Sequence, residues 1–231
     1  MARRTPDDKA APRTPSCLIV GAGPGIGQAC ARVFATAGHD VGLLLRHPAR
    51  VEEIVRDLRQ ATGRRIRSFA ADASVETSLT AGMAAACAEL GDPDVLIYNA
   101  ASTQRGRPTT LSGDQLIEDF RVNVAGALMA AKAVAPAMIR RGGGSILFTG
   151  GGSAYEPAAD YAALSLGKAA LRSLTYTLAQ ELGRSGIHVG MVTVFGFVQP
   201  GTHFDPQLIA ETYLRLHRQP KGHFEIESVY R

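Results

Sequence analysis

The amino-acid sequence predicts an α/β fold in which one doubly wound parallel sheet carries helices on both faces. Short apolar runs alternate with segments of helical periodicity along most of the chain. The runs are apolar almost throughout, as in strands that helices cover on both sides. A cluster of glycines directly follows the first run, which is typical of the turn between the first strand and the first helix of a single Rossmann-type domain.

The predicted elements begin with the run CLIV (17–20), followed by the glycine cluster and a helix with recurring apolar residues. The run DVGLLL (40–45) comes next. It leads into the segment 48–62, where aliphatic side chains recur at helical spacing. Pro48 suits the first turn of this helix, and Gly63 suits its end.

Four more apolar runs are predicted to be strands, at 66–71, 94–100, 145–150 and 187–194. Segments long enough for helices separate them, and crossovers of that length join parallel strands. The last helical pattern is PQLIAETYLRLHRQ. After it, the run FEIESVY is expected to add an edge strand.

The composition fits one globular domain. The chain has 231 residues, of which 45% are hydrophobic and 20% charged, enough to form a single core. Residues 1–15 are rich in proline, arginine and aspartate and have no periodicity. We therefore expect a flexible tail before a dinucleotide-binding domain that spans 16–231.

The charge and the cysteine content argue against several classes of function. The net charge is +4 and the basic residues are scattered, so no nucleic-acid partner is expected. Cys17, Cys30 and Cys87 are odd in number and far apart, which argues against a disulfide framework or a metal site and favours a cytoplasmic protein. The amino terminus carries Asp7, Asp8 and three prolines instead of an apolar stretch, so no export signal is expected. No later segment approaches about 18 uninterrupted apolar residues, so no membrane span is expected.

The cluster GAGPGIGQ places Gly21, Gly23, Gly25 and Gly27 in the turn before the first helix, with Ile26 among them. Such a turn brings backbone N–H groups close to a pyrophosphate, which rests on the positive end of the helix. Strand, turn, helix and second strand occur in the expected order. The cluster therefore predicts a dinucleotide site rather than only a tight turn.

The end of the second strand indicates which dinucleotide is bound. An acidic residue there would bind a ribose 2′-hydroxyl, whereas a basic residue favours a 2′-phosphate. The sequence reads LLLRHPAR, so Arg46 stands at this place. Because its planar guanidinium suits bidentate contact with phosphate, we expect NADP (NADPH) rather than NAD.

Further motifs follow in a fixed order along the chain. Asp72 lies in AADAS, Asn99 in YNAA, Asn123 in FRVNVAG, Lys168 in GKAAL and Gly196 in TVFGFV. Together with the glycine spacing Gly-x-x-x-Gly-x-Gly, these motifs resemble the short-chain dehydrogenase/reductase family. The resemblance covers nearly the whole predicted domain.

The resemblance implies a role for each of these residues. Asp72 would lie near the adenine ring, and Asn99 would end the strand beside the cofactor. Asn123 would help to hold a water molecule of the proton relay. Lys168 would bind the nicotinamide ribose and lower the pKa of a catalytic tyrosine, and Gly196 would belong to the turn beside the nicotinamide.

Two residues of the family's active site are missing from their usual positions. The family's tyrosine, four residues before the lysine, corresponds to Leu164, and its serine, thirteen residues earlier, corresponds to Gly151. A carbonyl group that accepts hydride needs a hydrogen-bond donor and then a proton within about 3 Å. The side chains at these two positions supply neither.

Other groups nearby are candidates for the missing proton donor. Tyr161 lies seven residues before Lys168, on nearly the same face of a helix but one turn too far along it, unless the helix begins later. Tyr155 and Ser153 lie in the preceding loop. A water molecule held by Asn123 and Lys168 is a further candidate, and the remaining alternative is a site without an acid.

The connection after Gly196 is short. Nine residues separate it from the last helical pattern, where many members of the resembled family carry a longer substrate-covering loop. We expect an open site that the C-terminal segment or a partner subunit completes. His203 and Phe204 either line this site or pack within the loop.

The sequence thus predicts an NADP-dependent oxidoreductase that transfers hydride between nicotinamide and a small carbonyl or alcohol substrate, with a relocated or missing proton donor. One alternative is a catalytically inactive NADP-binding sensor or partner subunit. Another is a lyase or isomerase reaction on the same scaffold. In the resembled family the helices that carry Asn123 and Lys168 form subunit contacts, which implies a homodimer or homotetramer.

Overall fold

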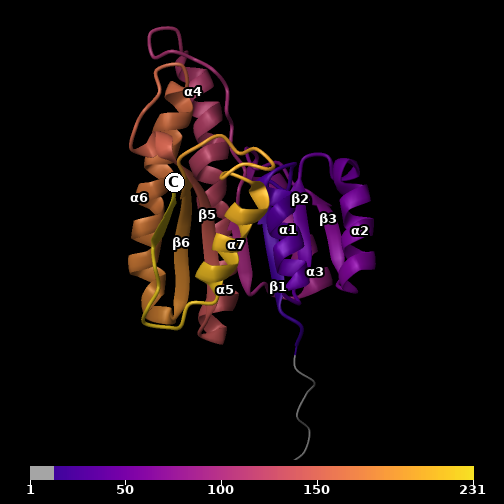
Figure 1. Cartoon of the computed structure of the whole chain (residues 1–231). Coiled ribbons are helices and arrows are strands. Elements are labelled where there is room, and N and C mark those ends of the chain that lie inside the picture. Colours follow the sequence, from indigo (N-terminus) through magenta and orange to yellow (C-terminus); the bar gives the residue numbers. More distant parts are fainter. Residues whose placement is uncertain (1–12) are drawn as a thin grey trace, which may run out of the picture.

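Seven parallel strands form one sheet in this computed structural model, which describes residues 13–231 (Figure 1). Along the sheet the strand order is β3-β2-β1-β4-β5-β6-β7. The strands are β1 (Ser16–Val20), β2 (Asp40–Leu45), β3 (Ile66–Ala70), β4 (Val95–Tyr98), β5 (Gly144–Gly151), β6 (Ile187–Val194) and β7 (Glu227–Tyr230). The six predicted strands and the added edge strand are all present, and the predicted fold class is confirmed.

Helices cover both faces of the sheet (Figure 1). One face carries α1 (Ile26–Thr36), α2 (Glu52–Thr62) and α7 (Pro206–His217), and the other carries α3 (Glu76–Leu90), α5 (Gly126–Arg141) and α6 (Ala162–Leu182). The helix α4 (Gly113–Phe120) runs into α5 through a π-helical turn, η2 (Arg121–Ala125). The 3-10 turns are η1 (Pro48–Val51), η3 (Gly152–Ala154) and η4 (Gly183–Ser185).

Each face of the sheet has its own apolar core. Ile19 of β1 belongs to the core under α1, α2 and α7, whereas Leu18 and Val20 belong to the core under α3, α5 and α6. Successive residues of a strand point to opposite faces, so both sets of side chains must be apolar. This explains why the predicted strands read as continuous apolar runs.

The segment predicted as one helix over 48–62 is divided in two. Pro48 starts the 3-10 turn η1, and the α-helix begins only at Glu52. A tighter 3-10 turn is common at the start of a helix. Gly63 adopts the left-handed conformation with φ of 65° and ends α2, as predicted.

The helical run Gly113–Arg141 is long and apolar enough to cross a membrane, judged by length and composition alone. Its buried residues face the sheet and α3. Ala127, Ala130, Val134 and Met138 are part of the apolar core on that side. This packing accounts for the apolar composition of the run.

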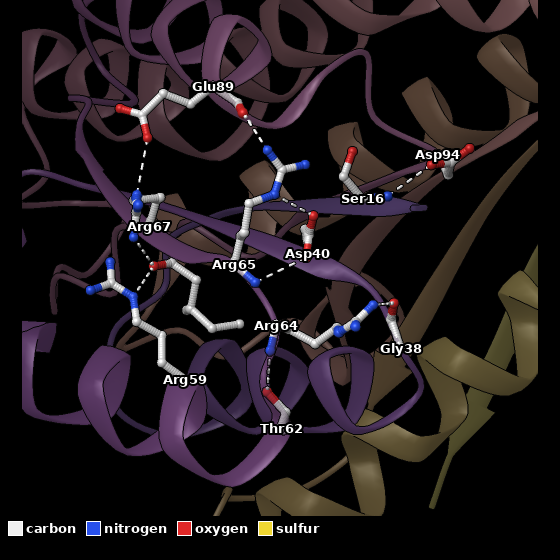
Figure 2. Close-up of polar contacts among 11 residues, drawn as sticks. Ser16, Gly38, Asp40, Arg59, Thr62, Arg64, Arg65, Arg67, Glu89 and Asp94 are labelled. Carbon is white, nitrogen blue, oxygen red and sulfur yellow. Dashed lines mark hydrogen bonds and ion pairs between the residues drawn. The ribbon is translucent and has the colours of Figure 1, made fainter. Parts of the chain in front are cut away.

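Two aspartates fix the amino-terminal ends of four strands (Figure 2). The Asp40 carboxylate accepts hydrogen bonds from the N–H and the Nε of Arg65, at 2.9 and 2.7 Å. The Asp94 carboxylate accepts one from the Ser16 N–H at 2.8 Å. It also accepts one from Arg13 at 2.6 Å. Of the predicted tail, residues 1–12 lie outside the described part of the chain, and Arg13 is held by Asp94.

A pair of histidines is packed near the amino-terminal ends of the strands. Nδ1 of His217, at the end of α7, lies 2.9 Å from the Ser145 hydroxyl, and the His217 ring packs edge-on against His39 with 5.4 Å between the centroids. Burial, reinforced by charge repulsion from His39, lowers the pKa of His217 to about 4. Burial also lowers the pKa of His39.

We expect the folded protein to lose stability as the pH falls below about 6.5. A histidine with a lowered pKa stays neutral in the folded state but takes up a proton in the unfolded state below its ordinary pKa of about 6.5. The stabilisation is fully present above that pH and decreases as the pH falls toward 4, by about 2 kcal/mol at pH 5 for His217 alone. Urea unfolding at pH 7.5, 6 and 5 measures it.

Two variants test whether His217 is the source of this pH dependence. His217→Asn keeps a hydrogen-bonding group near Ser145 but does not titrate, so it should flatten the dependence of the free energy of unfolding on pH. His223 is exposed, and His223→Asn should leave that dependence unchanged. An unaltered slope in His217→Asn would show that this histidine is not its source.

Candidate active site

The predicted cofactor residues gather at the carboxyl edge of the sheet. Gly21 follows β1, Arg46 follows β2, Asp72 follows β3, Asn99 follows β4 and Gly196 follows β6. In an open parallel sheet, ligands bind outside these strand ends at the point where the strand order reverses. Here that point lies between β1 and β4.

Close backbone contacts shape the glycine turn. Gly21 has a φ of 85°, and a Cβ on it would lie 2.4 Å from the Ala100 nitrogen. A Cβ on Gly27 would lie 2.5 Å from the carbonyl oxygen of Gly21, so α1 approaches β1 closely. Gly25, with φ of 96°, is the N-cap of α1. The positive φ values are open to glycine at little cost and strain other residues.

The amino terminus of α1 is suited to an anion. No side chain caps it, and its first turn carries no acidic residue. The side chain of Ile26 is buried in the core, so this residue offers its backbone to the site. A Cβ on Gly23 would meet no atom within 4 Å. Free N–H groups beside open space fit a phosphate group.

Arg46 and Asp72 stand on the nucleotide side of the turn. The Asp72 carboxylate accepts hydrogen bonds from the N–H and the hydroxyl of Ser74 at 2.9 and 2.7 Å. These bonds, aided by the positive charge of Arg46, hold the pKa of Asp72 below its ordinary value. The Arg46 side chain is exposed, and its guanidinium is available for a phosphate.

Asn99 ties the glycine turn to the neighbouring strands. Its Nδ2 donates to the carbonyl of Gly21 at 2.8 Å, and its N–H donates to Val20 at 2.8 Å. Its Oδ1 accepts from the Thr149 hydroxyl at 2.9 Å. Since the Thr149 hydroxyl donates its one proton to Asn99, the Tyr213 hydroxyl, 2.7 Å away, must donate to the Thr149 oxygen. Both ends of the Asn99 amide are therefore fixed.

Lys168 reaches the same edge from α6. Its Nζ donates to the carbonyl of Thr149 at 2.7 Å, and the residue is 7% exposed. Burial lowers the pKa of Lys168 to about 8, so the ammonium form still predominates at pH 7. Leu164 lies one turn earlier on α6, and a Cβ on Gly151 would be 3.6 Å from the lysine stem. Neither position offers the ammonium a hydroxyl group.

A π-helical turn orients Asn123. In η2 the N–H of Gly126 donates to the carbonyl of Arg121, five residues back. The buried Tyr98 hydroxyl donates to the Val122 carbonyl at 2.5 Å, and a Cβ on Gly126 would lie 2.4 Å from that hydroxyl oxygen. The wider turn interrupts the regular helical hydrogen bonds, and Tyr98 gives the Val122 carbonyl a partner.

The Asn123 side chain lies beside Lys168 but is bound to the loop after β4. Its Oδ1 accepts from the Ser102 N–H at 2.8 Å, and its Nδ2 donates to the Ser102 carbonyl at 3.3 Å. A Cβ on Gly167 would lie 2.8 Å from the Asn123 Cβ, so the two elements touch next to Lys168. The structure brings the two predicted residues together, with the Asn123 amide engaged by protein groups.

Tyr161 does not lie on α6, contrary to the helical-face prediction. It is the N-cap, with φ of −132°, and the helix begins at Ala162. Gly106 pairs with this segment: its N–H donates to Asp160 at 2.9 Å, and its carbonyl accepts from Ala162 at 3.1 Å. The pairing extends the backbone, and the Tyr161 hydroxyl accepts from the Arg105 Nε at 2.9 Å.

Ser153 lies in the 3-10 turn η3 after β5, and Tyr155 is the C-cap residue of this turn. The Tyr155 hydroxyl donates to the Glu227 carboxylate at 2.7 Å and accepts from the Arg172 Nε at 2.8 Å. The Arg172 guanidinium also lies over the Tyr155 ring, 4.7 Å from its centroid. The Tyr155 proton is therefore directed to a carboxylate of β7. The Ser153 side chain is half-buried.

His203 and Phe204 hold the loop after β6 against the C-terminal segment. The His203 Nε2 lies 2.5 Å from the Arg231 carbonyl, and its ring stacks on Tyr230 at 5.0 Å. A Cβ on Gly196 would lie 2.3 Å from the Phe204 ring. Of the two readings of these side chains, the contacts favour packing within the loop.

Sequence reasoning missed a buried carboxylate near Asn123. Asp119 is 3% exposed, and its Oδ1 accepts from the Ser102 hydroxyl at 2.5 Å and from the Gln115 Nε2 at 3.2 Å. A signal for it existed: Leu116, Asp119 and Asn123 recur at helical spacing in the sequence and so share one face. A charged residue on a buried helix face points to a polar partner.

The edge combines an uncapped helix start, an exposed guanidinium and a buried ammonium. This set suits a nucleotide, because backbone N–H groups and guanidinium bind phosphates. An ammonium can hydrogen-bond ribose hydroxyls and can give up a proton. Within residues 13–231, no group of three or more His, Cys, Asp or Glu side chains is arranged to hold a metal ion.

Comparison with known sequences gives consistent relatives. Residues 16–205 match the family described as short chain dehydrogenase. The 2,3-dihydro-2,3-dihydroxybenzoate dehydrogenase of Bacillus subtilis is 31% identical over 176 residues, covering 76% of this chain and 67% of that protein. Oxidoreductase UcpA of Salmonella typhimurium is 33% identical over 180 residues, covering 77% of this chain and 67% of that protein.

Solved structures show the same architecture. An alcohol dehydrogenase from the archaeon Thermococcus sibiricus, complexed with 5-hydroxy-NADP, superposes with a TM-score of 0.85 at 26% identity, covering 93% of this chain and 95% of that chain. A metagenomic short-chain oxidoreductase in complex with NADP has a TM-score of 0.85 at 27% identity, covering 94% and 97%.

We expect serine to be tolerated at position 151 but not at position 150. At Gly151 the backbone is extended, with φ of −157°, and a Cβ would only touch the Lys168 stem. At Gly150 it would lie 2.6 Å from the Thr193 hydroxyl oxygen and 2.7 Å from the Met191 sulfur. Gly150→Ser should therefore lower the free energy of unfolding by about 1 to 3 kcal/mol.

Urea unfolding of the two serine variants checks this contrast. Gly151→Ser should change the free energy of unfolding by less than about 1 kcal/mol, because ordinary contacts replace open space. Equal losses in both variants would contradict the geometry at the end of β5.

Proposed function

Because this chain belongs to the short-chain dehydrogenase family, we propose that it is an NADP-dependent oxidoreductase acting on a small carbonyl or alcohol substrate. The main support is the meeting of three groups at one sheet edge: the uncapped start of α1, the exposed Arg46 and the buried Lys168. Two similar solved structures hold NADP or a derivative of it. When bound, the cofactor supplies or accepts hydride at its nicotinamide ring.

In this proposal, different residues of the chain bind different parts of the cofactor. The first N–H groups of α1 bind the pyrophosphate, and Arg46 binds the 2′-phosphate. Asp72 lies on the adenine side. Asn99 and Gly196 border the nicotinamide half, and the ammonium of Lys168 binds the ribose hydroxyls. The ionised Asp72 and the protonated Lys168 suit these roles at neutral pH.

Fluorescence titration with NADPH and with NADH tests the cofactor. We expect micromolar binding of NADPH and at least about tenfold weaker binding of NADH, a difference of about 1.4 kcal/mol, because only NADPH carries the phosphate for Arg46. Arg46→Asp should reverse the preference, since a carboxylate repels the 2′-phosphate and accepts a hydrogen bond from a 2′-hydroxyl. No binding of either cofactor by the wild type would refute the proposal.

Gly23→Val is the matched control for the phosphate site. A Cβ at this position meets no atom within 4 Å, so the variant should keep the free energy of unfolding. It should lose NADPH binding, because its side chain would fill the space assigned to the pyrophosphate. Retained binding would place the cofactor elsewhere.

Leu164 and Gly151 favour a second candidate function, an NADP-binding sensor or partner subunit without turnover. Neither side chain can donate a hydrogen bond to a substrate oxygen. A panel of small carbonyl and alcohol substrates, followed by NADPH absorbance, distinguishes the two candidates. Tight NADPH binding without hydride transfer to any substrate would support the second.

We also propose that the protein is a homodimer or homotetramer that associates through α4 and α6. Ile117 and Phe120 on α4 are 54% and 41% exposed, and Leu166 on α6 is 53% exposed. A mainly apolar groove of about 580 Å³ lies between the starts of these helices. Exposed apolar surface of this extent is typical of protein interfaces.

Light scattering after size exclusion tests the interface. Leu166→Glu should yield monomers, because a carboxylate in an apolar interface would lose its hydration without a partner. Val75, at the N-cap of α3, is similarly exposed at 46%, and Val75→Glu should leave the assembly unchanged. A monomeric wild type would contradict the proposal.

We also propose that the protein is cytoplasmic. Cys17 and Cys30 are buried free thiols, and Cys87 is a half-buried free thiol. Thiols persist in a reducing compartment, where disulfides are rare.

A further inference from the structure

Asp119 is a buried carboxylate without a positive partner. It is 3% exposed, and none of the ion pairs among residues 13–231 includes it. Its Oδ1 accepts from the Ser102 hydroxyl at 2.5 Å and from the Gln115 amide at 3.2 Å. Burying a carboxylate beside neutral groups is costly.

Ser102 is held rigidly in front of this carboxylate. Its N–H donates to the Asn123 Oδ1 and its carbonyl accepts from the Asn123 Nδ2. Asn123 lies one helical turn after Asp119, so both residues project from one face of the α4–η2 segment. One binds the Ser102 main chain and the other binds its side chain.

The pair stands at the carboxyl edge of the sheet, inside the proposed active site. Ser102 follows Asn99 by three residues, and Asn99 holds the glycine turn through Gly21. On its other side, Asn123 touches α6 at Gly167, next to Lys168. Ser102 thus lies between the two groups that hold the cofactor in the proposed function. The residue is half-buried.

The other hydroxyl groups considered as proton donors differ from Ser102 in their partners. The Tyr155 proton is directed to Glu227, whereas the Tyr161 hydroxyl accepts from Arg105 and keeps its own proton. Ser153 lies in the turn η3, and within residues 13–231 no hydrogen bond engages its hydroxyl. Among the predicted alternatives is a water molecule held by Asn123 and Lys168, and the Asn123 side-chain amide is bound to the Ser102 main chain. A hydroxyl already paired with a buried carboxylate has a proton acceptor in place.

We propose that Ser102 is the catalytic hydroxyl of this enzyme and that Asp119 is its proton acceptor, an inference that rests on the proposed oxidoreductase function. In alcohol oxidation, the substrate O–H proton passes to the Ser102 oxygen as the Ser102 proton moves to the Asp119 carboxylate. A bound oxidised nicotinamide would accept hydride from the substrate carbon, while the electron pair of the broken O–H bond forms the carbonyl. In carbonyl reduction, Asp119 returns the proton through Ser102 to the substrate oxygen.

The test compares Ser102→Ala and Asp119→Asn with the wild type in kcat, KM, NADPH affinity and melting temperature. Loss of general acid–base catalysis should lower kcat by about 100-fold or more in both variants. The NADPH dissociation constant should stay within about threefold of the wild type, because neither side chain contacts the cofactor in this proposal. Asp119→Asn keeps the shape of the carboxylate but cannot take up the proton.

Two conservative variants serve as controls. Ser102→Thr retains the hydroxyl group and should keep most of kcat, and Thr103→Val removes the hydroxyl of the exposed neighbour and should be silent. The proposal is overturned if Ser102→Ala keeps kcat within about threefold, or if NADPH affinity and melting temperature fall along with kcat, as a structural role requires.

The wild-type results separate this inference from the proposed function. A wild type that binds NADPH but transfers hydride to no substrate overturns the role of Ser102 and leaves the cofactor site standing. A wild type that binds neither cofactor overturns the proposed function itself, and the role of Ser102 falls with it.

Discussion

The hydrogen bond from the Asn99 side chain to the carbonyl of Gly21 links the glycine turn to the end of β4, at the place where the paired strands β1 and β4 join the two halves of the sheet. On one side of β1 lie β2 and β3, and on the other lie the four later strands. The bond needs glycine at 21, because the Ala100 nitrogen stands where a Cβ would be. The Thr149 hydroxyl donates to the oxygen of the same amide, and the Thr149 carbonyl accepts a hydrogen bond from Lys168. Asn99 and Thr149 therefore connect the glycine turn to the lysine.

The polar groups around Lys168 differ from those that the family resemblance implies. Leucine and glycine stand at 164 and 151, so the ammonium of Lys168 has no hydroxyl partner at those places and binds a strand carbonyl instead. A carboxylate, Asp119, is buried one turn before Asn123. Both charged groups are costly to bury. Because no ion pair offsets this cost, a role in the proposed reaction explains the two buried groups better than a contribution to the stability of the fold.

Local patterns were sufficient for the fold and for the position of the nucleotide edge. The strands are apolar on both faces because helices cover both faces, and such runs are recognisable without knowing their neighbours. The glycine turn is recognisable from the sequence as well, because the positive φ angles of Gly21 and Gly25 favour glycine at those two positions. Tyr161 was misplaced because its conformation depends on pairing with Gly106, a segment far away in the sequence.

The sequence by itself determined the α/β fold, the order of its elements and the edge at which a dinucleotide fits, because periodicity and glycine spacing report what each residue buries or permits. Only the tertiary structure decided which polar groups meet. Ser102 and Asp119 are 17 residues apart, and the loop after β4 brings them together against α4. Helical spacing showed that Asp119 faces inward, but the identity of its partner depends on how distant segments cross. Hydrogen bonds between such segments leave no periodic pattern in the chain.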